Sequence, residues 1–406
     1  MPALSHIRVL DLSRVLAGPW CGQILADLGA EVIKVERPGA GDDTRTWGPP
    51  WMKDAEGRDT TEAAYFMAAN RGKKSVTVDI ARPEGQAVIR ALAAQSDILL
   101  ENYKVGGLEQ YGLDYASLRE VNPRLIYCSV TGFGQTGPYA SRAGYDFIIQ
   151  GIGGLMSITG ERDDLPGGGP QKVGVAVSDL MTGMYSSVAV LAALARREVS
   201  GVGQHIDMAL LDTQVAMTAN MSMNYFASGK PPKRAGNAHQ NIVPYQTFAA
   251  ADGHIILAVG NDSQFVKLCD VAGRPDLAKD PRFATNPARV KHREILVPML
   301  EDIFAAKPQR FWADGLEAAG VPCGAINDLA QTHADPQVQH RGMRVELPHP
   351  TAGKVPLVGS PMKFSESPVE YRSAPPLLGQ HTDEVLRDVL GMDDAAIAKL
   401  RAAKAV

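Results

Sequence analysis

The sequence has few cysteines, and their spacing disfavours two kinds of site. Only four occur in 406 residues, at Cys21, Cys128, Cys269 and Cys323. No Cys-x-x-Cys pair is present, so the spacing of a zinc site or of a dithiol redox motif is missing. Four isolated cysteines also make no disulfide framework. We therefore expect no bound metal and a reducing, cytoplasmic compartment.

An excess of positive charge and a long apolar run are also lacking. The formal net charge is −4 at pH 7, which argues against a large nucleic-acid or membrane footprint. We find no run of about 18 apolar residues that would predict a membrane span. The N-terminal "MPALSHIRVLDLS" turns polar too early for a secretory signal. With 45% hydrophobic and 21% charged residues, the composition is that of a globular protein, and its length favours two domains.

The first half of the chain alternates apolar strand patterns with helix patterns. Buried strands are predicted in "HIRVLDL", "EVIKVER", "SVTVDI", "DILLEN" and "LIYCSVTGF". Helices are predicted in "GPWCGQILADLGA", "PEGQAVIRALAAQS" and "LMTGMYSSVAVLAALARR". This alternation predicts an α/β fold with a parallel sheet that helices cover on both faces.

After about residue 215 the pattern changes. "GKPPKRAGNAH" predicts a connector, and "PYQTFAAADGHIILAVGND" predicts a hairpin turning at Asp252-Gly253. Helices in "SQFVKLCDVAG" and "HREILVPMLEDIFAA" complete a smaller α+β domain of residues 230–320. The C-terminal "LLGQHTDEVLRDVLG" predicts a helix with Thr382 as its cap.

The opening strand–turn–helix–strand order is also that of NAD-dependent enzymes, in which an acid such as Glu36 binds the ribose. However, the turn reads "SRVLAGPW" and lacks the G-x-G-x-x-G that lets the backbone approach a pyrophosphate. Pro19 fits the first turn of a helix instead. Lys34 and Arg37 flank Glu36, so we expect this acid to be ion-paired. Hydride chemistry is therefore disfavoured.

One carboxylate, Asp179 in "GVAVSDLMTGMY", lies between two largely apolar segments without a nearby His, Lys or second acid. Two interpretations are open. Asp179 could cap a helix that begins near Leu180, or it could be a nucleophile. Serine and cysteine nucleophiles need a base or a lowered pKa. A carboxylate with its ordinary pKa near 4 is ionised at neutral pH without any partner.

Several segments together resemble the class III CoA-transferases, the CaiB/BaiF family. They include "RVLDLSRVLAGPWCGQILADLGAEVIKVERP", "GDDTRTWGPP", "NRGKKSVTVD", "ENYKVGGLEQYGL", "IYCSVTGFGQTGPYASRAGYDFIIQGIGGLMSITG", "GVAVSDLMTGMY", "GVGQHIDMALLD" and "LLGQHTDEVL". The likeness runs nearly end to end. It is strongest to the branch that moves CoA from succinyl-CoA to dicarboxylates such as glutarate or 3-hydroxy-3-methylglutarate.

The resemblance implies a Rossmann-like large domain with a parallel sheet built from both termini, and a dimer of two interlocked chains. We expect residues 1–215 and 325–406 in the large domain and residues 230–320 in the small one. Connectors are expected near 216–229 and 321–324. CoA is then a substrate, as acyl-CoA, and no cofactor is held permanently.

The same resemblance implies roles for individual residues. Asp179 would be the nucleophile that forms an aspartyl anhydride and then an aspartyl-CoA thioester. Residues expected to contact CoA are Leu16, Ala17, Arg37, Asn70, Arg71, Lys73, Asn102, Tyr103, Lys104, Arg142, Tyr145 and Asp146. Arg45, Arg234 and His239 are candidates for the distal carboxylate of the acceptor. Gln110 stands where some members have an arginine, so a phosphate contact is altered there.

Two alternatives remain open within this resemblance. The α-methylacyl-CoA racemases have a His where this chain has Tyr145, and tyrosine, with a pKa near 10, is a poor base next to a thioester. They also use a glutamate where this chain reads "VGNDSQF". Transfer is therefore favoured over epimerisation. A non-catalytic CoA-binding protein with the same fold is the other alternative.

Overall fold

The computed structural model describes residues 1–406, and the chain forms two compact units. Unit 1 comprises Met1–Leu155, Val173–Met223 and Pro336–Val406, and unit 2 comprises Met156–Lys172 and Asn224–Asp335. These bounds differ from the expected domains in the segment Met156–Lys172 and in residues 325–335, which both group with unit 2. The division into a CoA-binding domain and a small domain stays a prediction.

Unit 1 is built around a six-stranded sheet whose strand order is β5-β2-β1-β6-β7-β8. Every neighbouring pair in it is parallel. The strands are β1 (Arg8–Asp11), β2 (Glu31–Glu36), β5 (Lys73–Thr77), β6 (Ile98–Glu101), β7 (Ile126–Thr131) and β8 (His205–Ala209). The predicted α/β class and parallel sheet are therefore confirmed. Because the chain order reverses between β1 and β6, a crevice opens beyond the carboxyl ends of these two strands.

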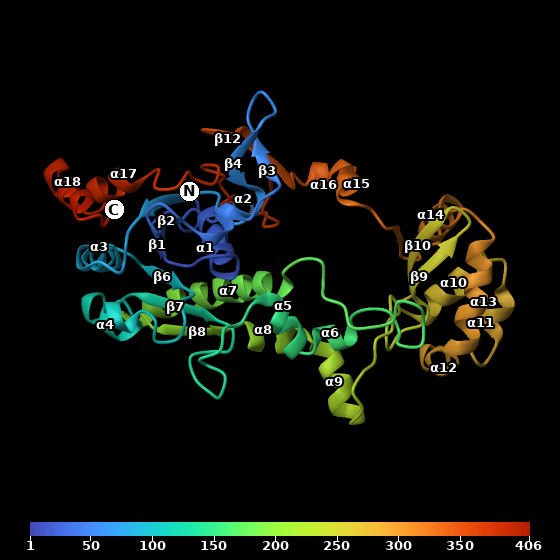
Figure 1. The fold of residues 1–406 in the computed structure, drawn as a ribbon. Coiled ribbons are helices and arrows are strands. Elements are labelled where there is room, and N and C mark those ends of the chain that lie inside the picture. The colour runs from blue at the N-terminus through green and yellow to red at the C-terminus, as the bar shows by residue number, and fades with distance from the viewer. The chain divides into compact units, whose positions relative to one another are not determined.

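Helices cover both faces of this sheet, so its strands are apolar on both sides. The helices that lie wholly in unit 1 are α1 (Ala17–Asp27), α2 (Ala64–Met67), α3 (Pro83–Ala94), α4 (Tyr115–Val121), α5 (Asp146–Ile152), α7 (Val177–Ser200), α8 (Leu210–Met217), α16 (Pro336–His340), α17 (Thr382–Asp388) and α18 (Asp394–Ala402). Two further helices, α6 (Leu155–Ile158) and α9 (Ala219–Ser228), contain points where the chain passes between units. In Figure 1, α3 and α4 lie on one side of the strands and α1 on the other.

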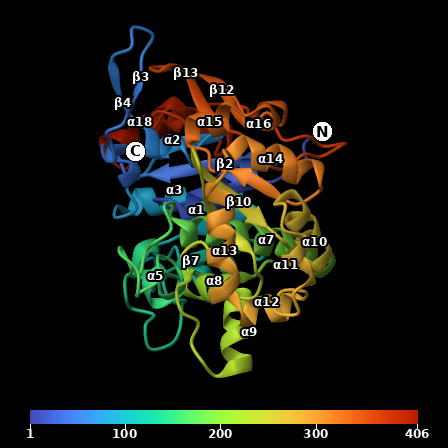
Figure 2. The ribbon, with the colours of Figure 1, turned by 90° about the vertical axis from the view of Figure 1, so that its right-hand side faces the viewer.

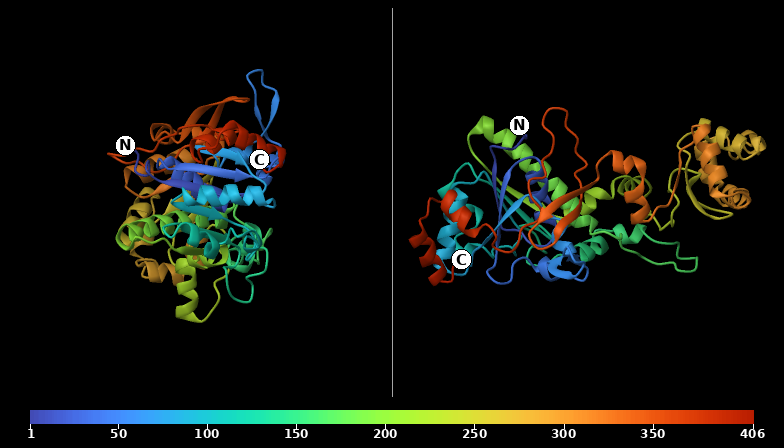
Figure 3. Two further views of the ribbon diagram at one scale, coloured as in Figure 1. Left: turned by 90° about the vertical axis from the view of Figure 1, so that its left-hand side faces the viewer. Right: turned by 90° about the horizontal axis from the view of Figure 1, so that it is seen from above.

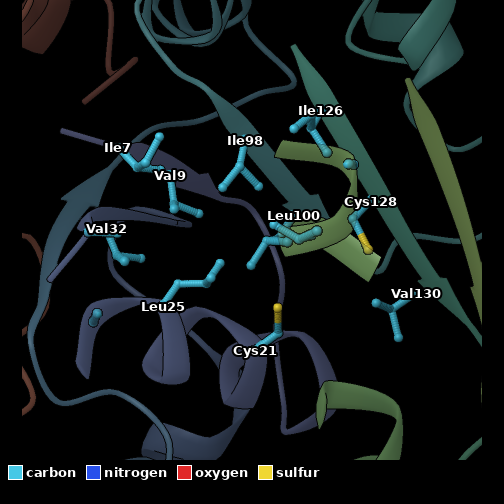
Figure 4. Packing of buried hydrophobic residues seen from close by; sticks show 14 of the residues in the cluster. Ile7, Val9, Cys21, Leu25, Val32, Ile98, Leu100, Ile126, Cys128 and Val130 are labelled. Carbon is cyan, nitrogen blue, oxygen red and sulfur yellow. The ribbon is translucent and has the colours of Figure 1, made fainter. Parts of the chain in front are cut away.

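One apolar core fills the space between the sheet and the helices α1 and α7. Cys21 and Leu25 of α1 point towards Val9 and Ile98 of the strands, as Figure 4 shows. Alternate strand residues such as Leu10 point to the opposite face, where a second core meets α3, α4, α17 and α18. Because successive side chains of a strand point to opposite faces, one short apolar run supplies both cores.

The C-terminal segment contributes helices to unit 1 and no strand to the parallel sheet, so the expectation of a sheet built from both termini is wrong. Figure 3 shows this segment beside the N-terminal half. Thr382 is not the cap of α17 either. The N-cap is His381, and the hydroxyl of Thr382 accepts a hydrogen bond from the backbone N–H of Thr77 at 3.1 Å. Its side chain therefore ties the helix to the sheet edge.

Two hairpins of unit 1 were not predicted from the sequence. They are formed by β3 (Trp51–Lys53) with β4 (Asp59–Ala63), and by β12 (Arg344–His349) with β13 (Gly353–Val358). Met52 and Met67 pack with Val345, Leu347 and Val355 in a small apolar cluster. Figure 2 shows the two hairpins next to each other.

Helix α7 is long and apolar enough to span a membrane, although no such segment was expected from the sequence. By length and composition alone its residues Val177–Ser200 meet that condition, which is weak evidence because core helices of soluble proteins meet it too. In unit 1, α7 contributes Val190, Ala193 and Leu194 to the core that it shares with α1 and the sheet. Packing within the unit therefore accounts for part of its apolar character.

Unit 2 contains the three-stranded antiparallel sheet β11-β10-β9. Its strands are β9 (Tyr245–Ala250), β10 (Gly253–Ala258) and β11 (Cys323–Ala325), and its helices are α10 (Asp262–Val271), α11 (Pro275–Lys279), α12 (Asn286–Lys291), α13 (Arg293–Ala305), α14 (Gln309–Ala318) and α15 (Leu329–Ala334). Phe248, Phe304 and Trp312 stack in its core. The predicted β9–β10 hairpin is present, although Ala250 pairs with Gly253, so the turn lies at Ala251-Asp252, one residue earlier than expected.

Candidate active site

Asp179 lies in the first turn of α7, at the crevice of unit 1. A glycine one turn later explains its position. A Cβ at Gly183 would lie 2.6 Å from the carbonyl oxygen of Ala17, so only glycine allows α7 to approach the start of α1 this closely. The carboxylate of Asp179 therefore lines the same cavity as Leu16 and Ala17.

Asp146, and not Asp179, caps helix α7. The carboxylate of Asp146 accepts hydrogen bonds from the backbone N–H groups of Ser178 at 2.7 Å and of Asp179 at 3.3 Å. Its other oxygen accepts from the side chain of Gln150 at 2.7 Å. The capping interpretation of Asp179 is therefore wrong. Asp146 does not line the cavity and supports the start of α7, and its expected contact with CoA stays a prediction.

The environment of Asp179 disfavours its charge. Burial, followed by the negative charge of Asp146, raises the pKa of Asp179 to about 7. No hydrogen bond or ion pair from another side chain offsets these two effects. The expectation of an ordinary pKa near 4 is therefore corrected, and about half of the Asp179 carboxyls are ionised at neutral pH. A carboxylate with a raised pKa is also a stronger base and a better nucleophile than an exposed one.

The inner cavity beside Asp179 has a volume of about 190 Å³. The loops that follow β1, β6 and β7 form its walls. Seven of the residues expected from the sequence to contact CoA line this cavity: Leu16, Ala17, Asn102, Tyr103, Lys104, Arg142 and Tyr145. Two glycines allow the closest contact in this wall, because a Cβ on Gly132 would lie 2.5 Å from the Cα of Gly144. Both residues border the cavity.

A second, outer cavity of about 600 Å³ adjoins the first and shares Arg14, Asp43, Tyr103 and Lys104 with it. Arg37 lines this outer cavity, as does Gln110, whose amide donates to the carbonyl of Gly107 at 3.1 Å. The side chains of Arg37 and Lys104 are exposed and form no ion pair within the chain. The two adjoining cavities have Asp179 in the inner part and the exposed cations Arg37 and Lys104 in the outer part.

Asn102 does not present its amide to the cavity in the expected way. Its side-chain oxygen accepts from the backbone N–H of Arg14 at 2.9 Å, and its side-chain nitrogen donates to the carbonyl of Arg14 at 2.7 Å. Asn102 therefore holds the loop after β1. Arg14 was missed by the sequence analysis, although it lines both cavities and pairs with Asp43 at 3.1 Å.

Asn70, Arg71 and Lys73 are buried and line neither cavity, and their expected contact with CoA stays a prediction. The ammonium of Lys73 donates to Asp11 at 2.9 Å and to Asn70 at 3.0 Å. The guanidinium of Arg71 donates to both carboxylate oxygens of Asp27, at 2.8 and 2.6 Å. These cations are committed to buried partners, so their role is structural.

Arg45 is also committed within unit 1 and lines neither cavity, and its assignment to the acceptor stays a prediction. Its guanidinium donates to both carboxylate oxygens of Glu36, each at 2.7 Å, and to the carbonyl of Pro376 at 3.1 Å. Its planar group also lies over the ring of Phe66 at 3.7 Å. Glu36 is thus ion-paired, although with Arg45 in place of the expected neighbours, and its side chain is buried.

His239 and Arg234 belong to unit 2. The imidazole of His239 accepts from the backbone N–H of Asn241 at 3.0 Å and packs against the ring of Tyr245. Arg234 is ion-paired with Asp163 and donates to the carbonyl of Glu161. The assignment of these two residues to the acceptor stays a prediction.

Two further titratable residues near the cavities were missed from the sequence. Burial, with added repulsion from the charges of Asp179 and Asp146, raises the pKa of Tyr65, so its hydroxyl stays protonated near the nucleophile. Burial likewise raises the pKa of Glu101 to about 7, and its carboxyl accepts from the backbone N–H of Tyr103 at 2.8 Å. Neither Tyr65 nor Glu101 belongs to a sequence motif that predicts a raised pKa near the cavities. No group of three or more His, Cys, Asp or Glu side chains is placed to hold a metal ion.

These features define an α/β protein with a nucleotide-type crevice at the switch point of a parallel sheet and a carboxylate nucleophile candidate inside it. The family model of CoA-transferase family III matches residues 4–382. A succinate–glutarate CoA-transferase of Agrobacterium fabrum is 52% identical over 96% of both chains. A human succinyl-CoA:glutarate CoA-transferase is 44% identical over 99% of this chain and 90% of its own length.

A solved structure supports the same assignment. The crystal structure of a CaiB/BaiF family protein from Brucella suis shares 51% identity and superposes with a TM-score of 0.82, covering 94% of this chain and 98% of the other. The chain belongs to CoA-transferase family III. The resemblance seen in the motifs is thereby confirmed.

Proposed function

We propose that this protein is a CoA-transferase that moves CoA from succinyl-CoA to a dicarboxylic acid, with glutarate as the first candidate. The observation that carries the proposal is the Asp179 carboxylate, which stands without a partner at the inner end of a cleft rimmed by cations. Membership of CoA-transferase family III supports it, as do relatives at 52% and 44% identity that carry the names of succinate–glutarate transferases.

The cleft suits the shape and charge of CoA. The inner cavity would hold the thioester and the pantetheine arm against Leu16 and Ala17. The outer cavity would hold the nucleotide, with Arg37 and Lys104 facing its phosphates, because cations without internal partners bind phosphate oxygens strongly. Arg142, whose guanidinium lies over the ring of Tyr139 at 3.8 Å, adds a cation to the inner rim.

The reaction would begin with attack of the Asp179 carboxylate on the thioester carbonyl of succinyl-CoA. The C–S bond breaks, CoA thiolate leaves, and an aspartyl–succinyl anhydride forms. The thiolate then attacks the aspartyl carbonyl, which releases succinate and leaves CoA bound to Asp179 as a thioester. The acceptor carboxylate repeats the two steps in reverse order and leaves as the new acyl-CoA. No proton has to be transferred, so a carboxylate needs no neighbouring base.

Both covalent intermediates would be lost if water reached them. A cavity of about 190 Å³ leaves little space beside a bound pantetheine arm. Exclusion of bulk water from such a site protects the activated acyl group and strengthens the electrostatic interactions within it. The free energy of the donor's thioester bond would then be conserved in the thioester of the acceptor.

Epimerisation of an acyl-CoA is the alternative that the family context leaves. It would need a base next to the α-carbon, and the cavity offers Tyr145 at the position where the racemases have His. Since the hydroxyl of tyrosine has an ordinary pKa near 10, it is a weak candidate for that step.

Incubation with succinyl-CoA and glutarate tests the proposed function. We expect glutaryl-CoA and succinate in equal amounts, measured by liquid chromatography with mass spectrometry. Short monocarboxylates such as acetate serve as matched acceptors and should react at least about tenfold more slowly, because they lack the second charge. Loss of the α-proton of an acyl-CoA to deuterated solvent, without any acid acceptor and without glutaryl-CoA formation, would show epimerisation instead.

We also propose that two chains form an interlocked homodimer in the cytoplasm. Helices α5, α7 and α8 expose large apolar side chains, which a second copy would cover: Phe147, Ile148, Ile152, Met184, Tyr185, Val188 and Val215. Apolar surface of this kind commonly marks a subunit interface. The four cysteines are unpaired, which suits a reducing compartment. Light scattering should give twice the chain mass of 43.4 kDa, and a monomer would contradict the dimer.

A further inference from the structure

The loop Ser13–Ala17, which carries Arg14 and Leu16 into the inner cavity, contains an unfavourable backbone conformation. Val15 has a φ of 71°, in the left-handed region. Glycine adopts this region readily, whereas a β-branched residue does so only when the surroundings hold it there. Val15 itself lines the inner cavity. The conformation of this residue therefore shapes the surface that a ligand would meet.

A buried ion pair fixes the backbone on either side of Arg14. The backbone N–H of Val15 donates to both carboxylate oxygens of Asp42, at 3.2 and 3.3 Å. The ammonium of Lys34 donates to Asp42 at 2.8 Å and to the carbonyl of Ser13 at 2.9 Å. Both side chains of the pair are fully buried. One ion pair thus holds the carbonyl of Ser13 and the amide of Val15 at the same time.

The carboxylate of Asp42 is ionised in this environment. Burial alone would raise its pKa, but the charge of Lys34 and hydrogen bonds from Lys34 and Thr44 outweigh that effect and lower the pKa of Asp42 to about 2. Thr44 donates to Asp42 through its backbone N–H at 3.0 Å and its hydroxyl at 2.8 Å. Charged acceptors form stronger hydrogen bonds than neutral ones, so the Val15 amide is held by a strong partner.

We propose that Asp42, supported by Lys34, is a positioning residue for the CoA site: it holds Val15 in its left-handed conformation and thereby gives the loop Ser13–Ala17 its ligand-binding shape. Asp42 lines the outer cavity but not the inner one, so its effect on the inner cavity acts through the loop. The inference rests on the proposed use of this cavity by CoA. It adds a buried residue outside the inner cavity whose loss changes CoA affinity.

A double-mutant cycle tests this role with the full-length protein. Asp42→Asn keeps the shape of the side chain but removes its charge, and CoA affinity is measured by titration calorimetry. We expect binding to weaken about tenfold, in line with the strain stored in such a conformation. In a Val15→Gly background the same change should weaken binding less than about threefold, because glycine adopts a positive φ without help.

Asp27→Asn is the matched control, because Asp27 is a second buried carboxylate, paired with Arg71, that lines neither cavity. It should lower the melting temperature without changing CoA affinity. Equal weakening by Asp42→Asn in the two backgrounds, or none in either, would overturn the proposal. If Asp42→Asn weakens CoA binding less in the Val15→Gly background but the protein forms no glutaryl-CoA, this inference is upheld and the transfer reaction is refuted.

If Asp42→Asn does not fold, hydrogen–deuterium exchange in the unmodified protein provides the test. The amide of Val15 should exchange far more slowly than an exposed loop amide, since it donates to a buried carboxylate. Exchange at the rate of an exposed peptide would show that Asp42 does not hold Val15.

Discussion

Replacement of Asp179 by asparagine should lower kcat for CoA transfer by at least about 10⁴-fold, the loss expected when a covalent nucleophile is removed. Asparagine has the same shape but cannot form an anhydride with a thioester. The measurement is the initial rate of glutaryl-CoA formation at saturating succinyl-CoA and glutarate.

Stability separates this loss from misfolding. Burial and Asp146 raise the pKa of Asp179 above its unfolded value, so the stability that its protonated form contributes is present at low pH and is lost as the pH rises through about 7. The asparagine variant should therefore melt at a higher temperature than the wild type at pH 8, with a smaller difference at pH 5.

Asp212→Asn is the matched control for Asp179→Asn. Asp212 is the third residue of α8, as Asp179 is the third residue of α7, but it is exposed and lines neither cavity. It should leave kcat within about twofold, the range typical of an exposed substitution that touches nothing in the site. Full turnover by the Asp179→Asn protein would refute a covalent role for this residue.

The second large effect is a steep dependence of kcat/KM on pH. Only ionised Asp179 attacks, and its pKa is raised to about 7 by burial and by Asp146. Below that pH the reactive fraction falls about tenfold per pH unit, so kcat/KM should be about 100-fold lower at pH 5 than at pH 8. CoA dissociation constants measured over the same range separate this effect from titration of the ligand phosphates.

Asp146→Asn should move the midpoint of that profile to lower pH. The variant removes the negative charge that adds to the effect of burial, and its side-chain oxygen can still accept from the amides of Ser178 and Asp179. Asp212→Asn should leave the midpoint unchanged. A flat profile in the wild type between pH 5 and 8 would show that Asp179 keeps an ordinary carboxylate pKa.

The fold of unit 1 could largely be predicted because its strands are short apolar runs buried on both faces. Residues such as Val9 and Leu10 serve opposite cores, so the pattern is continuous and easily recognised. The hairpins and the edge strand β8 were missed because their residues are half exposed and mixed in polarity. The C-terminal helix α17 was predicted, but α18 and the docking of both helices on the sheet were not.

Asp179 could be predicted from the sequence, but the buried partners of several other site candidates could not. Asp179 stands out because it lacks partners in its local sequence, and it also lacks them in the fold. Lys73 and Arg45 read as ligand-binding cations, but Asp11 and Glu36 neutralise them. Glu36 lies nearby in the sequence and Asp11 far away, and neither pairing is signalled by spacing. Asn102 lines the inner cavity as expected, but the hydrogen bond from its side chain to the backbone of Arg14, 88 residues earlier, is not signalled by spacing.

The most direct measurement follows oxygen atoms during turnover. Glutarate labelled with heavy oxygen in its carboxylates is supplied with succinyl-CoA in ordinary water, and the peptide that contains Asp179 is then weighed by mass spectrometry. The proposed anhydride leaves one acceptor oxygen on the Asp179 carboxylate in each cycle, so this peptide should gain heavy oxygen. Glutaryl-CoA formation with no label in this peptide would contradict covalent transfer through Asp179.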